Sequence, residues 1–226
     1  MRLLDLFCGA GMASDGYHAA GFTEVVGWDI NAQPNYPYEF HQGDALAVLA
    51  DTDYLSGFDL IHASPPCQAH TRAKHLRAAQ GGKSKYEDLL TPTLALLRAH
   101  DTAWIVENVP GAPGMEGAAI ECGSAYALGV RRHRLFASDA IPLTGSGCKH
   151  KEQGRPWGVY HVPKDDIPQG GRTARNVEHG RQVMGVTRDL TWNELKEGFP
   201  PAYTQHVGEQ AFDYLSMLTK HREVSA

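Results

Sequence analysis

Short apolar runs alternate with longer mixed segments along the first half of the chain. The apolar runs are typical of strands that are buried on both faces, and they predict strands at residues 2–7, 23–29, 58–64 and 103–109. The segments between them space their apolar positions as helices do, and they predict helices at residues 12–20, 44–50 and 91–100. In the last of these, Thr91 suits the N-cap and Pro92 the first helical position.

Strands that alternate with helices indicate an α/β fold with a mainly parallel sheet, because parallel neighbours need a crossover connection between them. Ligands of such sheets bind beyond the carboxyl ends of the strands. We therefore expect the functional residues to follow the predicted strands directly.

The pattern changes after residue 137. Residues 142–185 show little periodicity and mix glycine with several Lys and Arg, which predicts an irregular insert of loops and short strands. Helical patterning returns at 190–199 and after Pro201. These changes predict three segments, namely a main domain, a small insert and a C-terminal helical segment that packs back on the main domain, over residues 1–140, 141–186 and 187–226.

The length of 226 residues and the 42% hydrophobic content suit one large domain with a small appendage. The net charge of −5 is spread unevenly. Residues 1–60 carry one Lys or Arg against nine Asp or Glu, whereas residues 131–188 carry eleven against five. This asymmetry indicates a localised anion-binding face; the alternative is a merely mixed surface.

Several classes of protein are disfavoured by the composition. No uncharged apolar run approaches the length of a membrane span, and the start of the chain does not resemble a signal peptide because Asp5 interrupts it. The four cysteines are scattered, which predicts reduced thiols in a cytosolic protein. The spacing of Cys148, His150, His161 and His179 is irregular compared with structural zinc patterns, so we predict no metal site.

The segment "LLDLFCGAGMASDGYHAAGF" reads as a strand, a glycine loop and a helix. Gly9 and Gly11 allow a tight turn and a close approach of a ligand to a helix start, although Ser14 breaks the dinucleotide-binding pattern. Asp29 ends the second strand, and Asp44 would follow a third strand that lies between residue 29 and the helix at 44–50. Acidic residues at strand ends accept hydrogen bonds from ribose hydroxyls, so this half of the chain predicts a site for a nucleoside-containing cofactor.

A second candidate site lies in "ASPPCQAH", residues 63–70. Two prolines restrict the backbone directly before Cys67, so the loop holds its thiol in one place. Taken alone, the stretch is equally consistent with a Pro-rich turn around a buried cysteine.

Four blocks follow one another along the chain: "DLFCGAG" (5–11), "PPCQ" (65–68), "ENV" (107–109) and "RRHR" (131–134). This set resembles the cytosine carbon-5 DNA methyltransferase family, in its small bacterial or phage form, and the resemblance covers residues 1–137 well. It implies a Rossmann-like fold that uses S-adenosylmethionine, with the insert as a small target-recognition region.

The resemblance also implies the chemistry. The thiolate of Cys67 would add to carbon 6 of cytosine, which makes carbon 5 nucleophilic. Glu107 would hydrogen-bond or protonate ring nitrogen 3, and Arg134, with Arg132 beside it, would hold the ring carbonyl oxygen. The ring edge cannot be reached inside a duplex, so the base must be flipped out or already be single-stranded.

The resemblance implies a cofactor site for S-adenosylmethionine at Asp5, Phe7, Gly9, Ala10, Gly11, Asp29, Ile30, Asp44 and Pro65. The predicted DNA contacts are Gln68, Arg172 and Arg175. We expect a monomer that acts on double-stranded DNA in the cytoplasm of a bacterial or phage-infected cell, in restriction–modification for example, with no membrane partner.

Three points stay open at this stage. The family's Gln before the arginines is Val130, and "HVGEQA" (206–211) keeps only Gly208 of the last family block. Residues 75–85 suit a mobile loop that closes over the flipped base, or a plain solvated loop. The same chemistry on RNA, or a non-catalytic nucleic-acid-binding relative, are the alternative functions.

Overall fold

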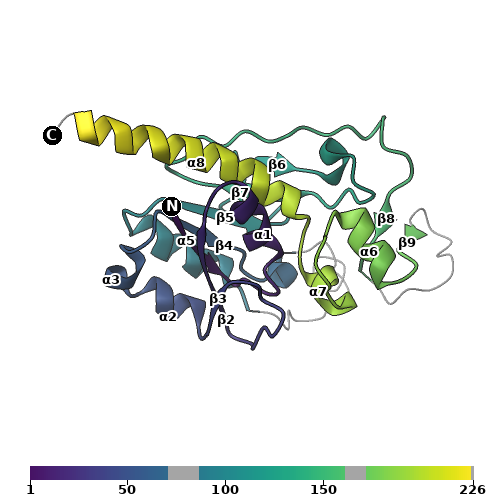
Figure 1. Cartoon of the computed structure of the whole chain (residues 1–226), viewed down its shortest axis with the longest axis horizontal. Helices are drawn as coiled ribbons and strands as arrows, with labels where there is room; N and C mark the ends of the chain where they lie inside the picture. The colour runs from purple at the N-terminus through teal and green to yellow at the C-terminus, as the bar shows by residue number, and fades with distance from the viewer. Residues whose placement is uncertain (71–86, 161–171, 225–226) are drawn as a thin grey trace.

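A sheet with the strand order β3-β2-β1-β4-β5-β7-β6 forms the centre of the protein (Figure 1). The computed structural model describes residues 1–70, 87–160 and 172–224. The strands of this sheet are β1 (Arg2–Leu6), β2 (Glu24–Asp29), β3 (Glu39–Gln42), β4 (Leu60–Ala63), β5 (Trp104–Asn108), β6 (Ala119–Glu121) and β7 (Arg134–Ala137).

Strands β1 to β5 pair in parallel, whereas β7 runs antiparallel to both β5 and β6. The predicted α/β fold and all four predicted strands are confirmed, because a strand buried on both faces is a continuous apolar run. Strands β6 and β7 were not predicted. They are only three and four residues long, and β6 exposes Ile120 between two buried residues.

Helices lie on both faces of the sheet and make a three-layer arrangement. Leu4 and Leu6 pack with residues of α2 and α5 in one apolar cluster, while Leu3 packs with residues of α1 and α8 in another. Alternate residues of a strand point to opposite faces, so β1 contributes to both clusters. The helices are α1 (Met12–Ala19), α2 (Ala45–Leu49), α3 (Thr52–Leu55), α5 (Leu90–Arg98), α6 (Val177–Met184), α7 (Trp192–Glu197) and α8 (Pro201–Val224), with short 3-10 turns η1 (Cys67–Ala69) and η2 (Gly123–Tyr126).

The predicted start of α5 is wrong. The carboxylate of Asp88 accepts the backbone N–H groups of Leu90 and Thr91 and the Thr91 hydroxyl, so it satisfies the free N–H groups of the first turn. Thr91 therefore lies inside the helix instead of capping it, and Pro92 is its third residue.

Helix α8 packs closely on α1, as Figure 1 shows in yellow and purple. A Cβ atom at Gly16 would clash with the Pro201 carbonyl, and one at Gly208 would meet Tyr17 at 2.8 Å. The Thr204 hydroxyl donates to the Ala13 carbonyl at 2.8 Å. Gly208, the residue shared with the last family block, thus allows two helices to approach each other.

The predicted insert contains a small parallel ladder of β8 (Trp157–Gly158) and β9 (Arg172–Thr173), followed by α6. Helix α6 lies in a segment predicted to be irregular. Buried residues of this region pack against Met12 at the start of α1 and against Leu195 of α7. The boundaries of the three segments remain a prediction, and the loop predicted at 75–85 lies outside the described residues.

None of the helices in residues 1–70, 87–160 and 172–224 combines the length and the apolar character that a bilayer crossing requires.

Candidate active site

The loop after β1 forms one side of the candidate site. Phe7, Gly9 and Gly11 adopt positive φ angles of 58°, 49° and 82°, so the chain turns sharply before α1. The Gly9 N–H donates to Oδ2 of Asp29 at 3.1 Å, and the Asn31 N–H donates to Oδ1 at 2.9 Å. Asp29 at the end of β2 therefore holds the glycine loop in place.

The surface beside this loop is open and partly apolar. A Cβ atom at Gly9 would meet no atom within 4 Å, and Ile30, directly after Asp29, is 63% exposed. Asp44 is exposed at the N-cap of α2, where it accepts from the Leu46 N–H at 2.9 Å. The predicted positions after β1, β2 and β3 thus lie at the carboxyl ends of neighbouring strands.

Asp5 lies beneath the loop. It is fully buried, it accepts the Ser14 hydroxyl, and that hydroxyl also contacts the Tyr36 hydroxyl at 2.7 Å. Burial raises the pKa of Asp5 to about 7, against the lowering effect of Ser14. These contacts favour a supporting position under the loop over the direct cofactor contact that was predicted.

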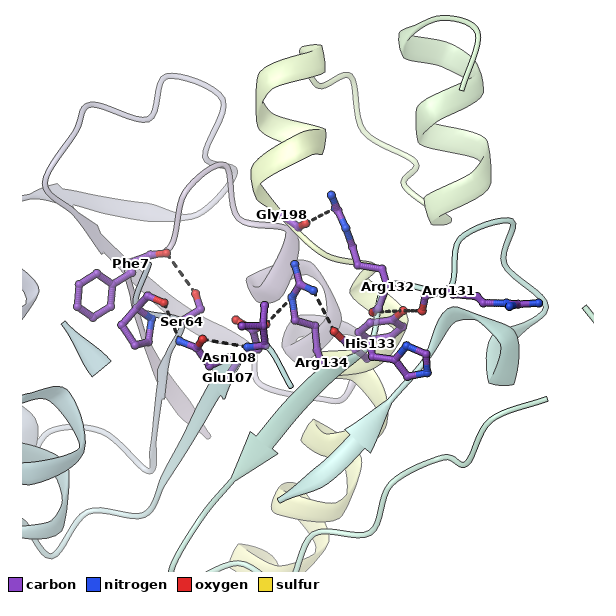
Figure 2. A network of polar contacts seen from close by, with 12 residues as sticks. Phe7, Ser64, Glu107, Asn108, Arg131, Arg132, His133, Arg134 and Gly198 are labelled. Carbon is purple, nitrogen blue, oxygen red and sulfur yellow. Dashed lines mark hydrogen bonds and ion pairs between the residues drawn. The ribbon is translucent and has the colours of Figure 1, made fainter. Parts of the chain in front are cut away.

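The Cys67 loop is tied to the strands on either side of β4 (Figure 2). The Asn108 side chain of β5 donates to the Pro65 carbonyl at 3.0 Å. Toward β1, the Ser64 hydroxyl donates to the Phe7 carbonyl at 3.3 Å. Sequence reasoning missed both Asn108 and Ser64, although Asn108 belongs to the "ENV" block and Ser64 precedes Pro65 directly.

Glu107 and Arg134 form a buried ion pair, with Arg134 Nε 2.7 Å from Glu107 Oε1 (Figure 2). Glu107 is 5% exposed. Burial raises the pKa of its carboxyl to about 7, and the lowering effects of Arg134 and Arg132 do not cancel that shift. Burial therefore makes this carboxyl easier to protonate than an exposed glutamate.

The thiol of Cys67 shares this electrostatic environment. Burial is the largest influence and raises the pKa of Cys67; Arg134 and Arg132 lower it, while Glu107 raises it further. The sheet thus brings three of the predicted catalytic residues, Cys67, Glu107 and Arg134, into one neighbourhood. Gln68 is exposed beside the cysteine.

The side chain of Arg132 is occupied elsewhere. Its backbone has a φ angle of 33°, and its guanidinium donates to the carbonyls of Val159, Leu195 and Lys196 at 2.9–3.0 Å and to that of Gly198 (Figure 2). These contacts hold the insert and the C-terminal end of α7 against the sheet. They support a positioning role for Arg132 in place of the catalytic role that was predicted.

Arg172 and Arg175 lie on the insert, where both are exposed. Their guanidinium carbons lie 5.2 and 5.8 Å from the centre of the Trp157 ring. The imidazole of His179 packs edge-on against the same ring, with the two ring centroids 4.4 Å apart. A neighbouring cleft of about 420 Å³ is lined by Lys149 and Trp157 among other residues. Arg172 and Arg175 thus form a small exposed cationic surface on the insert.

The strand order, the glycine loop and the strand-end acids define the Rossmann-like fold of class I S-adenosylmethionine methyltransferases. The family model described as C-5 cytosine-specific DNA methylase matches residues 1–121, more than half of the chain. The protein therefore belongs to the C-5 cytosine-specific DNA methylase family.

A curated relative is the type II methyltransferase M.AgeI of Thalassovita gelatinovora, which is 26% identical over 160 residues. The match covers 63% of this chain and 35% of that protein, so this chain spans about a third of the relative's length.

Solved structures with the same fold include a protein described as a DNA modification methyltransferase encoded within an E. coli prophage, with a TM-score of 0.62 and 13% identity over 96% of this chain and 99% of that one. The methyltransferase EhMeth of Entamoeba histolytica gives 0.61 and 13% over 95% and 98% of the two chains. A DNMT2 mutant of Spodoptera frugiperda gives 0.56 and 12% over 95% and 99%. At these identities the likeness concerns the fold.

Proposed function

We propose that the protein is a DNA cytosine-5 methyltransferase that transfers a methyl group from S-adenosylmethionine through a covalent Cys67–cytosine intermediate. The observation that carries this proposal is the convergence of three family blocks on one edge of the sheet. Asn108 of β5 ties the Cys67 loop to that strand. Arg134 of β7 pairs with Glu107, which also lies on β5. A nucleophile, a proton donor and a cation are thereby available to one base.

The residues around the glycine loop fit S-adenosylmethionine. Each carboxylate oxygen of Asp29 accepts one backbone N–H and retains capacity for a ribose hydroxyl. Exposed Ile30 offers an apolar surface to the flat adenine, and the open space at Gly9 admits the ligand close to the backbone. When bound, the cofactor supplies the electrophilic methyl group.

The protein's own residues perform the remaining steps. The Cys67 thiolate forms a bond to carbon 6 of the cytosine while Glu107 gives a proton or a hydrogen bond to nitrogen 3, so the charge displaced onto the ring is neutralised. Arg134 orients the Glu107 carboxyl through their ion pair. After carbon 5 takes up the methyl group, its proton passes to solvent water, the Cys67–carbon bond breaks, and nitrogen 3 returns any proton that it took from Glu107, which restores the aromatic ring, the thiolate and the acid.

The cationic surface of the insert is the proposed DNA contact, and the target base is flipped toward Cys67. Arg172 and Arg175 stand on Trp157, so their guanidinium groups are held in place for phosphates or a base edge. We place this activity in the cytoplasm of a bacterial or phage-infected cell, with a monomer as the acting form.

Replacing Cys67 with alanine tests the nucleophile. We expect Cys67→Ala to abolish methyl transfer, because the proposed nucleophile is removed, while the affinity for S-adenosylmethionine stays within about threefold. DNA containing 5-fluorocytosine should form a covalent adduct with the wild type, visible as a mass shift. Cys8→Ala is the matched control, since Cys8 is buried and should leave adduct formation intact. An adduct with Cys67→Ala would contradict the assignment.

Replacing Glu107 with glutamine tests the acid. Glutamine keeps the shape of the side chain but cannot supply a proton, so we expect single-turnover methylation to slow by about 10²-fold or more. DNA affinity should change little. Glu121→Gln, which alters another fully buried carboxylate, is the control and should retain the wild-type rate. An unchanged rate in Glu107→Gln would remove Glu107 from the mechanism.

Salt-dependent binding tests the DNA contact. If Arg172 and Arg175 each touch a phosphate, Arg172→Ala and Arg175→Ala should each make the negative slope of log affinity against log salt shallower by about 0.9. Arg98→Ala is the control and should keep the wild-type slope. Arg98 is an exposed arginine of α5 that pairs with Asp139. If both insert variants bind like the wild type at every salt concentration, the insert does not contact DNA.

A further inference from the structure

Two cysteines and two histidines converge beside Arg132 and Arg134. One ligand atom from each of Cys122, His133, Cys148 and His150 lies within 4.8 Å of each of the others. The Cys122 sulfur is 3.3 Å from His150 Nε2, and the Cys148 sulfur is 3.4 Å from His133 Nε2. The two imidazole rings stand at 83° to each other with centroids 5.1 Å apart, so they are not stacked.

These distances suit a tetrahedral ion. Zinc lies about 2.3 Å from thiolate sulfur and about 2.0 Å from imidazole nitrogen, which places neighbouring S and N ligands roughly 3.5 Å apart. Both measured sulfur–nitrogen distances are close to that value. Two thiolates and two imidazoles select zinc over hard cations such as Mg²⁺ or Ca²⁺.

The four residues come from three separate segments. Cys122 follows β6 directly, His133 precedes β7, and Cys148 and His150 lie in the loop between β7 and β8. The polypeptide around them is already fixed, because the Gly123 N–H donates to the Arg131 carbonyl at 2.9 Å and the Lys149 N–H to the Ser124 hydroxyl at 3.0 Å. The ligands therefore need little rearrangement to bind an ion.

We propose that Cys122, His133, Cys148 and His150 form a structural zinc site. On binding, each cysteine thiol releases its proton to solvent, so two thiolates balance the charge of the ion and the site is neutral. Four protein ligands fill the coordination sphere, which is the arrangement of structural and not catalytic zinc. No metal site was predicted from the sequence, where Cys148, His150, His161 and His179 were considered together. Only Cys148 and His150 of those four belong to this cluster. His161 lies outside the described residues, and His179 packs on Trp157.

The site would fix the segment that carries the catalytic arginine. His133 lies between Arg132 and Arg134 (Figure 2), and Arg132 holds an uncommon positive φ angle. A zinc ion on His133 would attach this turn to the loop after β7 and to the end of β6. Zinc content is independent of methyl transfer, so it can be measured whether or not the enzyme's substrate is known.

Metal analysis of the whole chain tests the site. The protein is produced with zinc in the medium and purified with a phosphine reductant and no chelator. We expect elemental mass spectrometry to find about one zinc per chain. The double variant Cys148→Ala/His150→Ala should lose it. Cys67→Ala and His179→Ala are the matched controls, because each removes one cysteine or histidine outside the cluster, and both should retain the metal.

A second measurement does not depend on any variant. Cobalt bound to the wild type in place of zinc should show the intense visible bands of a tetrahedral site and a thiolate charge-transfer band, and a strong chelator should lower the melting temperature of the wild type. Three results would overturn the proposal: a wild type that takes up neither zinc nor cobalt, a double variant that keeps its zinc, or a metal-free protein in which Cys122 and Cys148 form a disulfide.

Discussion

The buried ion pair between Glu107 and Arg134 is the interaction on which the rest of the site depends. It joins β5, the last parallel strand, to the antiparallel strand β7. A buried charge is costly unless its partner is present, and removing one partner of such a pair typically costs about 3–5 kcal/mol of stability. The pair therefore fixes β7 on β5, next to the loop that Asn108 holds around Cys67. It also explains how a carboxyl with a pKa near neutrality is kept inside the protein, ready to lose or accept a proton.

The segment 131–134 connects the parts of the protein around that pair. The side chain of Arg134 pairs with Glu107 of β5. Arg132 has a positive φ angle, and its guanidinium donates to carbonyls of the insert and of residues 195–198. Tyr203 of α8 donates its hydroxyl to the carbonyls of Arg131 and Arg132 from the other side. Two arginines two positions apart thus make different contacts: Arg134 pairs with Glu107, and Arg132 holds the surrounding segments together. The proposed zinc ion on His133 would add a third connection to the same turn.

Much of the fold and the core of the site could be predicted because both depend on local patterns. Buried parallel strands are continuous apolar runs, and the family blocks follow them directly. The remaining features depend on tertiary contacts. The start of α5 was misplaced because the Asp88 carboxylate accepts the N–H groups of Leu90 and Thr91, so the helix begins before Thr91. The different orientations of Arg132 and Arg134 follow from one backbone angle, which spacing does not encode. The Cys and His cluster is assembled from three segments spread irregularly over residues 122–150, so no regular spacing reveals it.

The central claim is that this chain methylates carbon 5 of cytosine in DNA. The most direct measurement incubates the protein with unmethylated DNA, and separately with RNA, in the presence of S-adenosylmethionine carrying a deuterated methyl group. Each nucleic acid is then digested to nucleosides and analysed by mass spectrometry. The account predicts deuterated 5-methyl-2′-deoxycytidine from the DNA and no labelled nucleoside from the RNA. Label found only in RNA, on an exocyclic nitrogen of a DNA base, or in neither nucleic acid would contradict it.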